Sequence, residues 1–98
     1  MTEVNIIYGN DDSDVDIISV PDCIVHIIEE LGQLFCIWLQ CTENEFRQVS
    51  EDGFVYSICE TESFIIWLNR YICNGTEKAI IVRQHTVLDK SSCYTVNF

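Results

Sequence analysis

The sequence predicts an α+β fold in which two helices pack on a small antiparallel or mixed β-sheet, with the element order β-α-β-β-α-β-β. Two segments carry apolar residues at the three- and four-residue intervals of one helical face. Runs of β-branched and aromatic residues precede, divide and follow these segments. The chain has 98 residues and no repeat, low-complexity tract or linker, so residues 1–98 are expected to form one domain.

The N-terminal region is expected to contain one or two strands. Residues 4–8 are rich in β-branched residues, which predicts a strand. Residues 9–14 contain only glycine, asparagine, aspartate and serine, which predicts a polar turn. Residues 15–20 are expected to be a second strand or an extended lead into a helix, because Val20 precedes a proline and this disfavours helical backbone.

One long helix is expected over residues 21–40. Pro21 is tolerated in a first helical turn, and Asp22 suits the positive end of the helix dipole. The apolar positions of one face, at intervals of four, three, four and three residues, are Ile24, Ile28, Leu31, Phe35 and Trp38. Gly32 costs about 1 kcal/mol relative to alanine inside a helix. It marks a kink, a close packing contact or a break, and after a break residues 33–40 are expected to form a strand instead.

A β-hairpin and a second helix are expected in the middle of the chain. Asp52-Gly53 lies between the β-prone runs 46–49 and 54–58, which is typical of a hairpin turn. Thr61 is expected to be the N-cap of an amphipathic helix that ends before Asn74-Gly75. Two further strands and the turn between them are expected at residues 78–87, 94–98 and 88–92.

The charge of the chain is unevenly distributed. Residues 1–62 hold fourteen of the sixteen acidic residues and one basic residue, Arg47, whereas residues 63–98 hold two acids and four basic residues. The net charge is −11, but 48% of the residues are hydrophobic, which argues against a disordered acidic tail. A folded domain with a strong negative field attracts basic partners and repels nucleic acid. The sequence therefore predicts a binding protein whose target is basic, such as a nuclease.

The six cysteines are expected to be reduced thiols rather than disulfides or metal ligands. The N-terminus shows neither the basic nor the apolar region of a signal peptide, and thiols stay reduced in the cytoplasm. No apolar run approaches the roughly 20 residues that span a bilayer, so a cytoplasmic location is expected. The cysteines of apolar segments, which are expected to be buried, are Cys23, Cys36, Cys59 and Cys73.

The residue types that carry catalysis or bind metals form no recognisable motif. His26 in the predicted helix and His85 in a predicted strand are both expected to face solvent. The aspartate-rich run that starts at Asp11 lacks the glycine that a calcium loop needs at its sixth position. No phosphate-binding glycine loop, nucleophile elbow or zinc-protease motif is present. We therefore expect no enzyme activity, no cofactor and no metal site.

An acidic surface that contains aromatic residues is the best candidate for a functional site. Carboxylates cluster around the predicted hairpin, next to aromatic side chains of the kind that anchor protein interfaces. The aspartates of the predicted N-terminal turn form a second acidic group. The residues expected to contact a partner are Asp11, Asp12, Asp14, Glu43, Glu45, Glu51 and Asp52, with Tyr56 as the candidate anchor.

Three segments resemble the immunity proteins of bacterial contact-dependent growth inhibition systems: the helix entry 19–21, the helix segment 62–69 and the closing strand 94–98. The resemblance implies a cytoplasmic protein that binds one cognate toxin domain tightly and blocks its active site. Such toxins are often RNases or DNases with basic clefts, which agrees with the charge of this chain. The resemblance implies no individual binding residue, because members of this family share no fixed set.

The predicted function is therefore that of an immunity protein in a heterodimer with a basic toxin domain, with no direct contact to nucleic acid or membrane. The main alternative is a phage inhibitor that mimics nucleic acid, of the anti-restriction or anti-CRISPR type. A small enzyme or metal protein that uses cysteine and histidine, and a dimeric structural subunit, are further alternatives. The phage inhibitor predicts a large host nuclease as partner, and the enzyme or metal protein predicts a reactive thiol or bound metal. The dimeric subunit predicts a melting temperature that depends on protein concentration.

Overall fold

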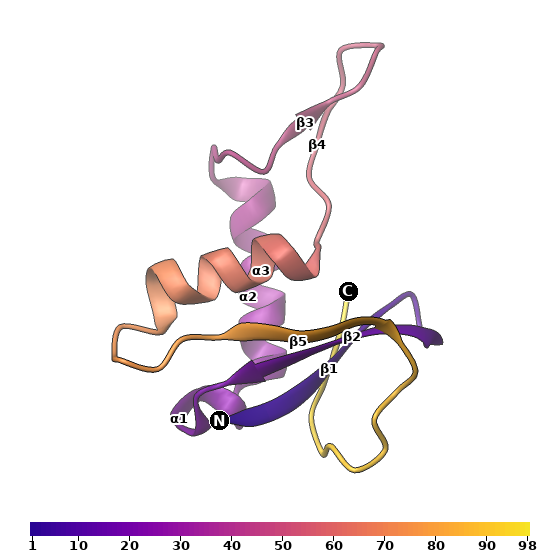
Figure 1. The fold of residues 1–98 in the computed structure, drawn as a ribbon. Helices are drawn as coiled ribbons and strands as arrows, with labels where there is room; N and C mark the ends of the chain where they lie inside the picture. Colours follow the sequence, from indigo (N-terminus) through magenta and orange to yellow (C-terminus); the bar gives the residue numbers. More distant parts are fainter.

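The sheet at the centre of the computed structural model, which describes residues 1–98, has four strands in the order β5-β2-β1-β6 (Figure 1). β1 (Thr2–Tyr8) and β2 (Asp11–Val20) form an antiparallel hairpin whose two turn residues both have positive φ, as tight hairpin turns require. β5 (Ile80–Thr86) pairs antiparallel with β2, and β6 (Thr95–Asn97) pairs parallel with β1. The predicted α+β class is confirmed, and the sheet is mixed.

The N-terminal hairpin is longer than the sequence predicts. β2 begins at Asp11, so the turn shrinks from residues 9–14 to the two residues Gly9 and Asn10. The first four residues of β2 are exposed, and its last six are buried. The prediction of a turn over residues 11–14 is wrong because these residues extend the strand beyond the core, where polar side chains are tolerated. Residues 15–20 form a strand rather than an extended lead.

The single helix expected over residues 21–40 is divided into two. α1 (Asp22–Val25) ends after about one turn, and two residues separate it from α2 (Ile28–Cys41). The Ile27 N–H donates to the carbonyl of Ile24 at 3.1 Å, a tight three-residue turn, and Ile27 itself leaves the helical region with φ −115° and ψ 18°. The apolar spacing continues across this break, which is why periodicity alone did not reveal it.

Gly32 does not interrupt α2. It is buried where α2 crosses β6, and a Cβ atom at this position would lie 2.7 Å from Cγ1 of Val96. Glycine therefore allows the helix and the strand to approach closely. The interpretation as a close packing contact is correct, and the alternative of a strand over residues 33–40 is wrong.

The second predicted helix is present with a different start. α3 (Thr61–Trp67) continues into a π-helical turn, Leu68–Ile72, and ends before Asn74-Gly75 as predicted. Glu60, with extended backbone, precedes the helix, and Thr61 is its fully buried first residue rather than its N-cap. No helix of the structure has the length and apolar content needed to cross a bilayer.

An aromatic core lies between the sheet and the two longer helices. Phe35 of α2 is at its centre, with the ring centroids of Phe64, Trp67 and Phe98 at 5.3, 5.5 and 6.0 Å from its own. Val4 of β1 belongs to the same buried cluster, which shows that α2 and α3 cover one face of the sheet. The aromatic side chains of α2, α3 and the C-terminus therefore pack the helices against the sheet.

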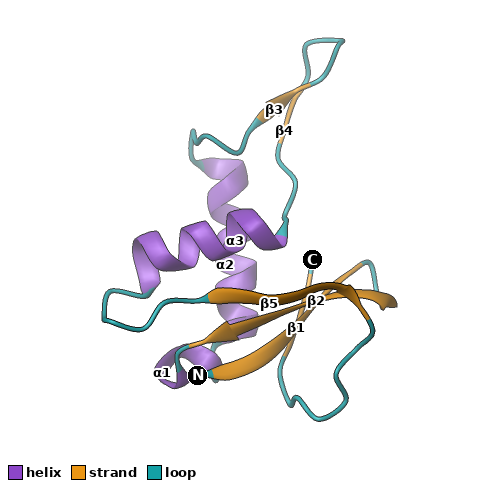
Figure 2. Cartoon of the chain, in the orientation of Figure 1, coloured by secondary structure: helices purple, strands orange, loops and turns teal.

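The segment between β5 and β6 is a long loop (Figure 2), and a buried side-chain amide fastens it to the sheet. Asn5 alternates along β1 with core residues, so its side chain points away from the helices. Its Nδ2 donates to the carbonyl of Asp89, and the N–H of Asp89 donates to its Oδ1, both at 3.0 Å. Asn5 is therefore satisfied although it is 1% exposed, and it positions the loop that leads to β6.

Candidate protein-binding surface

A hairpin projects from the helices, away from the four-stranded sheet (Figure 1). We call residues 42–58 the arm. Its strands β3 (Gln48–Val49) and β4 (Val55–Tyr56) are antiparallel and contain two residues each. Gly53 in the connecting turn has φ +85°, a conformation that favours glycine. The predicted hairpin and its Asp52-Gly53 turn are confirmed, although the paired strands are shorter than expected.

The base of the arm is fixed to the C-terminal turns of α2. The hydroxyl of Ser57 and the side-chain amide of Asn44 both donate to the carbonyl of Leu39, each at 3.2 Å. The ring of Phe46 packs edge-on against Trp38, with 6.2 Å between centroids. Both sides of the arm are therefore held by the same part of α2, while its turn is exposed.

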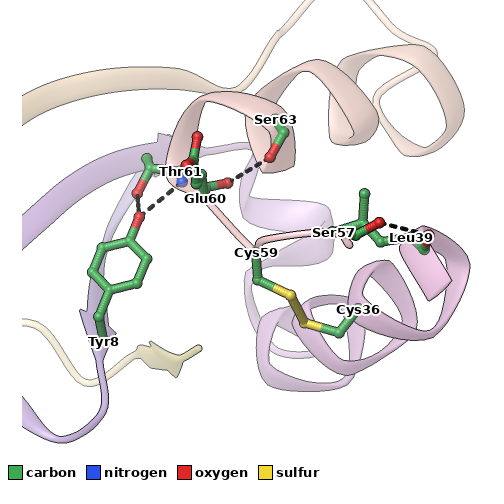
Figure 3. Close-up of a disulfide and its surroundings, with 8 residues drawn as sticks. All are labelled: Tyr8, Cys36, Leu39, Ser57, Cys59, Glu60, Thr61 and Ser63. Carbon is green, nitrogen blue, oxygen red and sulfur yellow. Dashed lines mark hydrogen bonds between the residues drawn. A yellow bond between two sulfur atoms is a disulfide. The ribbon is translucent and has the colours of Figure 1, made fainter. Parts of the chain in front are cut away.

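A disulfide between Cys36 and Cys59 closes the arm by joining α2 to the residue before Glu60 (Figure 3). The two Cα atoms are 6.1 Å apart, within the usual range for a bridge. The prediction that all six cysteines are reduced is therefore wrong for this pair. Among the other cysteines expected to be buried, Cys73 is buried and Cys23 is exposed. The path of the arm, rather than a spacing motif, brings residues 36 and 59 together.

The carboxylates predicted on the hairpin differ in their availability. Glu51 and Asp52 are exposed at the turn of the arm, and Glu43 is exposed near its start. Glu45 instead forms a two-pronged ion pair, with Nη1 and Nη2 of Arg70 at 2.5 and 3.2 Å from its carboxylate oxygens. These hydrogen bonds lower the pKa of Glu45. Glu45 therefore ties the arm to the α3 segment, whereas the other three carboxylates remain free to meet a partner.

The predicted aspartates of the N-terminal region lie at the start of β2, apart from the turn of the arm (Figure 1). Asp11 accepts hydrogen bonds from the hydroxyl and the N–H of Ser13 at 2.6 and 3.0 Å, which lowers the pKa of Asp11. Asp12 is exposed. Asp14 pairs with His85, with 3.0 Å between Oδ1 and Nδ1. The eight predicted residues therefore form two groups rather than one patch.

A hollow of about 400 Å³ lies between these two groups. Asp14 and Asp16 of β2 contribute to its lining, together with Glu60 and Glu62 at the start of α3. Ile58, the last residue of the arm, lines it as well, so the hollow connects the arm with the end of the sheet. The sequence did not reveal that Asp16, Glu60 and Glu62 line this hollow. No local signal marks them, because only the docking of α3 beside β2 brings them together.

Tyr8, Asp16 and Thr61 form a hydrogen-bonded cluster at the hollow, of which Figure 3 shows Tyr8 and Thr61. The hydroxyl of Thr61 donates to Oδ2 of Asp16 at 2.5 Å, and the Thr61 N–H donates to the Tyr8 hydroxyl oxygen at 2.8 Å. The N–H of His85 donates to Oδ1 of Asp16 at 3.2 Å. Burial raises the pKa of Tyr8. Asp16 therefore serves the internal packing of α3 on β2.

The ion pair of His85 with Asp14 leads to a prediction about pH. The hydrogen bond that His85 donates to Asp14 and the charge of Asp14, with smaller effects of the Asp16 and Glu62 charges, raise the pKa of His85 above its ordinary value of 6.5. The folded state therefore binds this proton more tightly than the unfolded chain. The resulting stabilisation is complete below pH 6.5 and is lost as the pH rises through the raised pKa.

NMR titration of the imidazole protons measures this effect directly. The midpoint of His85 should lie above 6.5 in the native protein and should fall in Asp14→Asn, which keeps the shape of the side chain but removes its charge. A variant His26→Gln assigns the two histidine signals. Equal midpoints for His85 with and without the Asp14 carboxylate would show that the pair is not formed in solution.

The chemistry that this surface offers is the attraction of cations. Its exposed groups include several carboxylates, and no three histidine, cysteine, aspartate or glutamate side chains are placed so that they could hold a metal ion. No protein-family model matches the chain, and no curated protein or solved structure matches it significantly.

Proposed function

We propose that this protein is an immunity protein that binds a cognate toxin domain and occludes its active site. The toxin is a nuclease with a basic cleft, and the complex is a heterodimer. The observation that carries this proposal is the set of carboxylates found at the turn of the arm, around the hollow and at the start of β2. Carboxylates on this surface take the place of the phosphates that the cleft binds.

The acidic side chains have few cationic partners within the protein. Four ion pairs are formed when His85 is protonated, and their acidic members are Glu3, Asp14, Asp22 and Glu45. The carboxylates of the arm and the hollow that take part in none are Asp16, Glu43, Glu51, Asp52, Glu60 and Glu62. A partner that supplies lysine and arginine side chains relieves the repulsion between them and stabilises the fold by mass action. A nuclease cleft is a partner of this kind.

We propose the cytoplasm as the place of action, because the nucleic acids that such a toxin attacks lie there. The disulfide bears on this part of the proposal, since disulfides are rare in the reducing cytoplasm. Alkylation in intact cells followed by mass spectrometry tests it. Thiols of Cys36 and Cys59 that react support a cytoplasmic protein, and thiols that are both protected place the protein in an oxidising compartment.

The first experiment uses the tagged protein as bait in a lysate of the organism that makes it. Recovery of a small basic domain at near one-to-one ratio supports the proposal if the freed domain cleaves RNA or DNA and the pure protein inhibits it again. Recovery of a large host or CRISPR nuclease favours instead a phage inhibitor that mimics nucleic acid. Recovery of no basic protein contradicts both functions.

Charge reversal at the turn of the arm should slow association with the toxin. Glu51→Lys combined with Asp52→Lys is expected to lower the association rate constant by about tenfold at low salt, and to make it less sensitive to salt, because steering by opposite charge is weakened. Stopped-flow kinetics over a salt series measures both effects. Glu77→Lys, which changes an exposed carboxylate on the loop before β5, is the control and should change the rate less. Identical rates in all three proteins exclude the turn from the binding surface.

A further inference from the structure

The arm carries large apolar side chains that the fold leaves in solvent. Phe54, next to the turn, is 71% exposed, and Val49 and Val55 are 66% and 59% exposed. A two-stranded hairpin without further strands is marginally stable by itself, and these side chains do not pack in the core to support it. Glu51 and Asp52 lie in the same turn. Large exposed apolar side chains beside charged groups are typical of a surface that binds another protein.

Phe54 is better placed to anchor an interface than Tyr56. Phe54 lies immediately before β4, and Tyr56 is the last residue of that strand. The hydroxyl of Tyr56 donates to Oε1 of Gln48 at 2.9 Å, so its polar end is occupied within the arm. The backbone of Phe54 is fixed by two hydrogen bonds with Ser50, at 2.8 and 3.1 Å, while its ring remains exposed closer to the turn. The anchor predicted from the sequence is therefore not the most available aromatic ring.

Contacts at the base of the arm also fix its direction in the free protein. The hydrogen bond from Ser57 to Leu39 fixes its returning side, and the ion pair of Glu45 with Arg70 fixes its outgoing side. The disulfide at Cys59 adds to these contacts in its oxidised form, and they hold the arm without it. A binding element that is already ordered loses less conformational entropy when it binds. These contacts fix the base of the arm, so that its turn projects in a defined direction toward a partner.

We propose that the arm inserts into a concave site of a basic partner protein, where Phe54 fills an apolar pocket and Glu51 and Asp52 meet lysine and arginine side chains on its rim. The identity of this partner as a toxin rests on the proposed function, whereas the mode of docking rests on the arm itself. A second copy of the chain is disfavoured as the occupant, because residues 42–60 hold five acidic residues and one basic residue and two arms repel each other.

Photo-cross-linking tests which surface meets the partner. The probe is p-benzoylphenylalanine, placed at position 54 in one sample and at position 37 in the control, since Ile37 is 57% exposed on α2. Both samples are illuminated in a lysate of the source organism. A basic protein linked from position 54 and not from position 37 supports the proposal. Linkage from position 37 alone, or from position 54 only to a second copy of the chain, overturns it.

The variant Phe54→Ala tests the anchor against the protein that the cross-link identifies. Its Kd should be at least about tenfold higher than that of the native protein, as for an aromatic interface anchor. Val87→Ala, at a position 68% exposed between β5 and β6, is the matched control and should change the Kd by less than about twofold. Both variants should unfold at the urea concentration of the native protein, because neither side chain is buried. An unchanged Kd for Phe54→Ala overturns the proposal.

The two proposals fail in different ways. If Phe54→Ala binds a nuclease toxin with native affinity and neutralises it fully, the proposed function is supported and insertion of the arm is overturned. Weaker binding of Phe54→Ala to a basic partner that has no toxic activity supports insertion of the arm and contradicts the proposed function.

Discussion

Phe35→Ala is expected to remove a large part of the stability of this fold. Phe35 is fully buried in α2, and its ring contacts aromatic side chains from α3 and from the C-terminus. Truncation of a buried phenylalanine typically costs about 3–5 kcal/mol, because burial is lost and a cavity remains. Small domains are stable by only about 5–15 kcal/mol, so the variant should unfold at a much lower urea concentration. Tryptophan fluorescence across a urea series measures the shift.

Leu34→Ala is the matched control for this prediction. Leu34 precedes Phe35 in the same helix, but its side chain is 49% exposed, so the change in unfolding free energy should stay within about 0.5 kcal/mol. Phe35→Leu retains most of the apolar volume and should fall between the two. Equal urea midpoints for Phe35→Ala and Leu34→Ala would mean that Phe35 is not in the core.

Reduction of the disulfide between Cys36 and Cys59 is expected to have the next largest effect on stability. The bridge joins residues 23 positions apart and encloses the whole arm. Restriction of an unfolded loop of this length corresponds to about 3 kcal/mol in the chain-entropy treatment. The reduced protein should therefore unfold at a lower urea concentration than the oxidised protein. Cys36→Ser, Cys59→Ser and the double variant should all lose the same amount, because each removes the same bond.

Cys41→Ser is the control for the bridge. Cys41 is an exposed free thiol at the end of α2, so this variant should keep the native urea midpoint and its sensitivity to reductant. Amide hydrogen exchange adds a local measurement, since loss of the bridge should speed exchange in β3 and β4 more than in β1. A reduced protein with the midpoint of the oxidised protein would show that the bridge does not constrain the chain in solution.

The parts of the fold that depend on local signals could be predicted from the sequence. Asp52-Gly53 specified the turn of the arm because its conformation requires a residue tolerant of positive φ. The apolar face after Thr61 and the stop before Asn74 specified α3 in the same way. The break between α1 and α2 could not be predicted, because the apolar positions before and after Ile27 keep the spacing of one helix.

The sequence predicted that carboxylates gather around the hairpin, but not which of them stay free of ion pairs. A cluster of carboxylates around the hairpin follows from composition, and Glu43, Glu51 and Asp52 are exposed there. Glu45 belongs to the same run of sequence, yet Arg70 holds it, because α3 passes close to the base of the arm. Pairings across 25 residues leave no trace in local sequence.

The sequence by itself determined the α+β class, the strong negative charge of the N-terminal two thirds and the turn of the arm, because each depends on composition or on neighbouring residues. Only the tertiary structure decided which carboxylates keep no cationic partner, which cysteines form a bridge and which aromatic ring stays in solvent. Each of these depends on where distant segments pack. Asp16 illustrates the difference: in the sequence it is one aspartate of an acidic run, and in the fold it is a buried hydrogen-bond acceptor for Thr61.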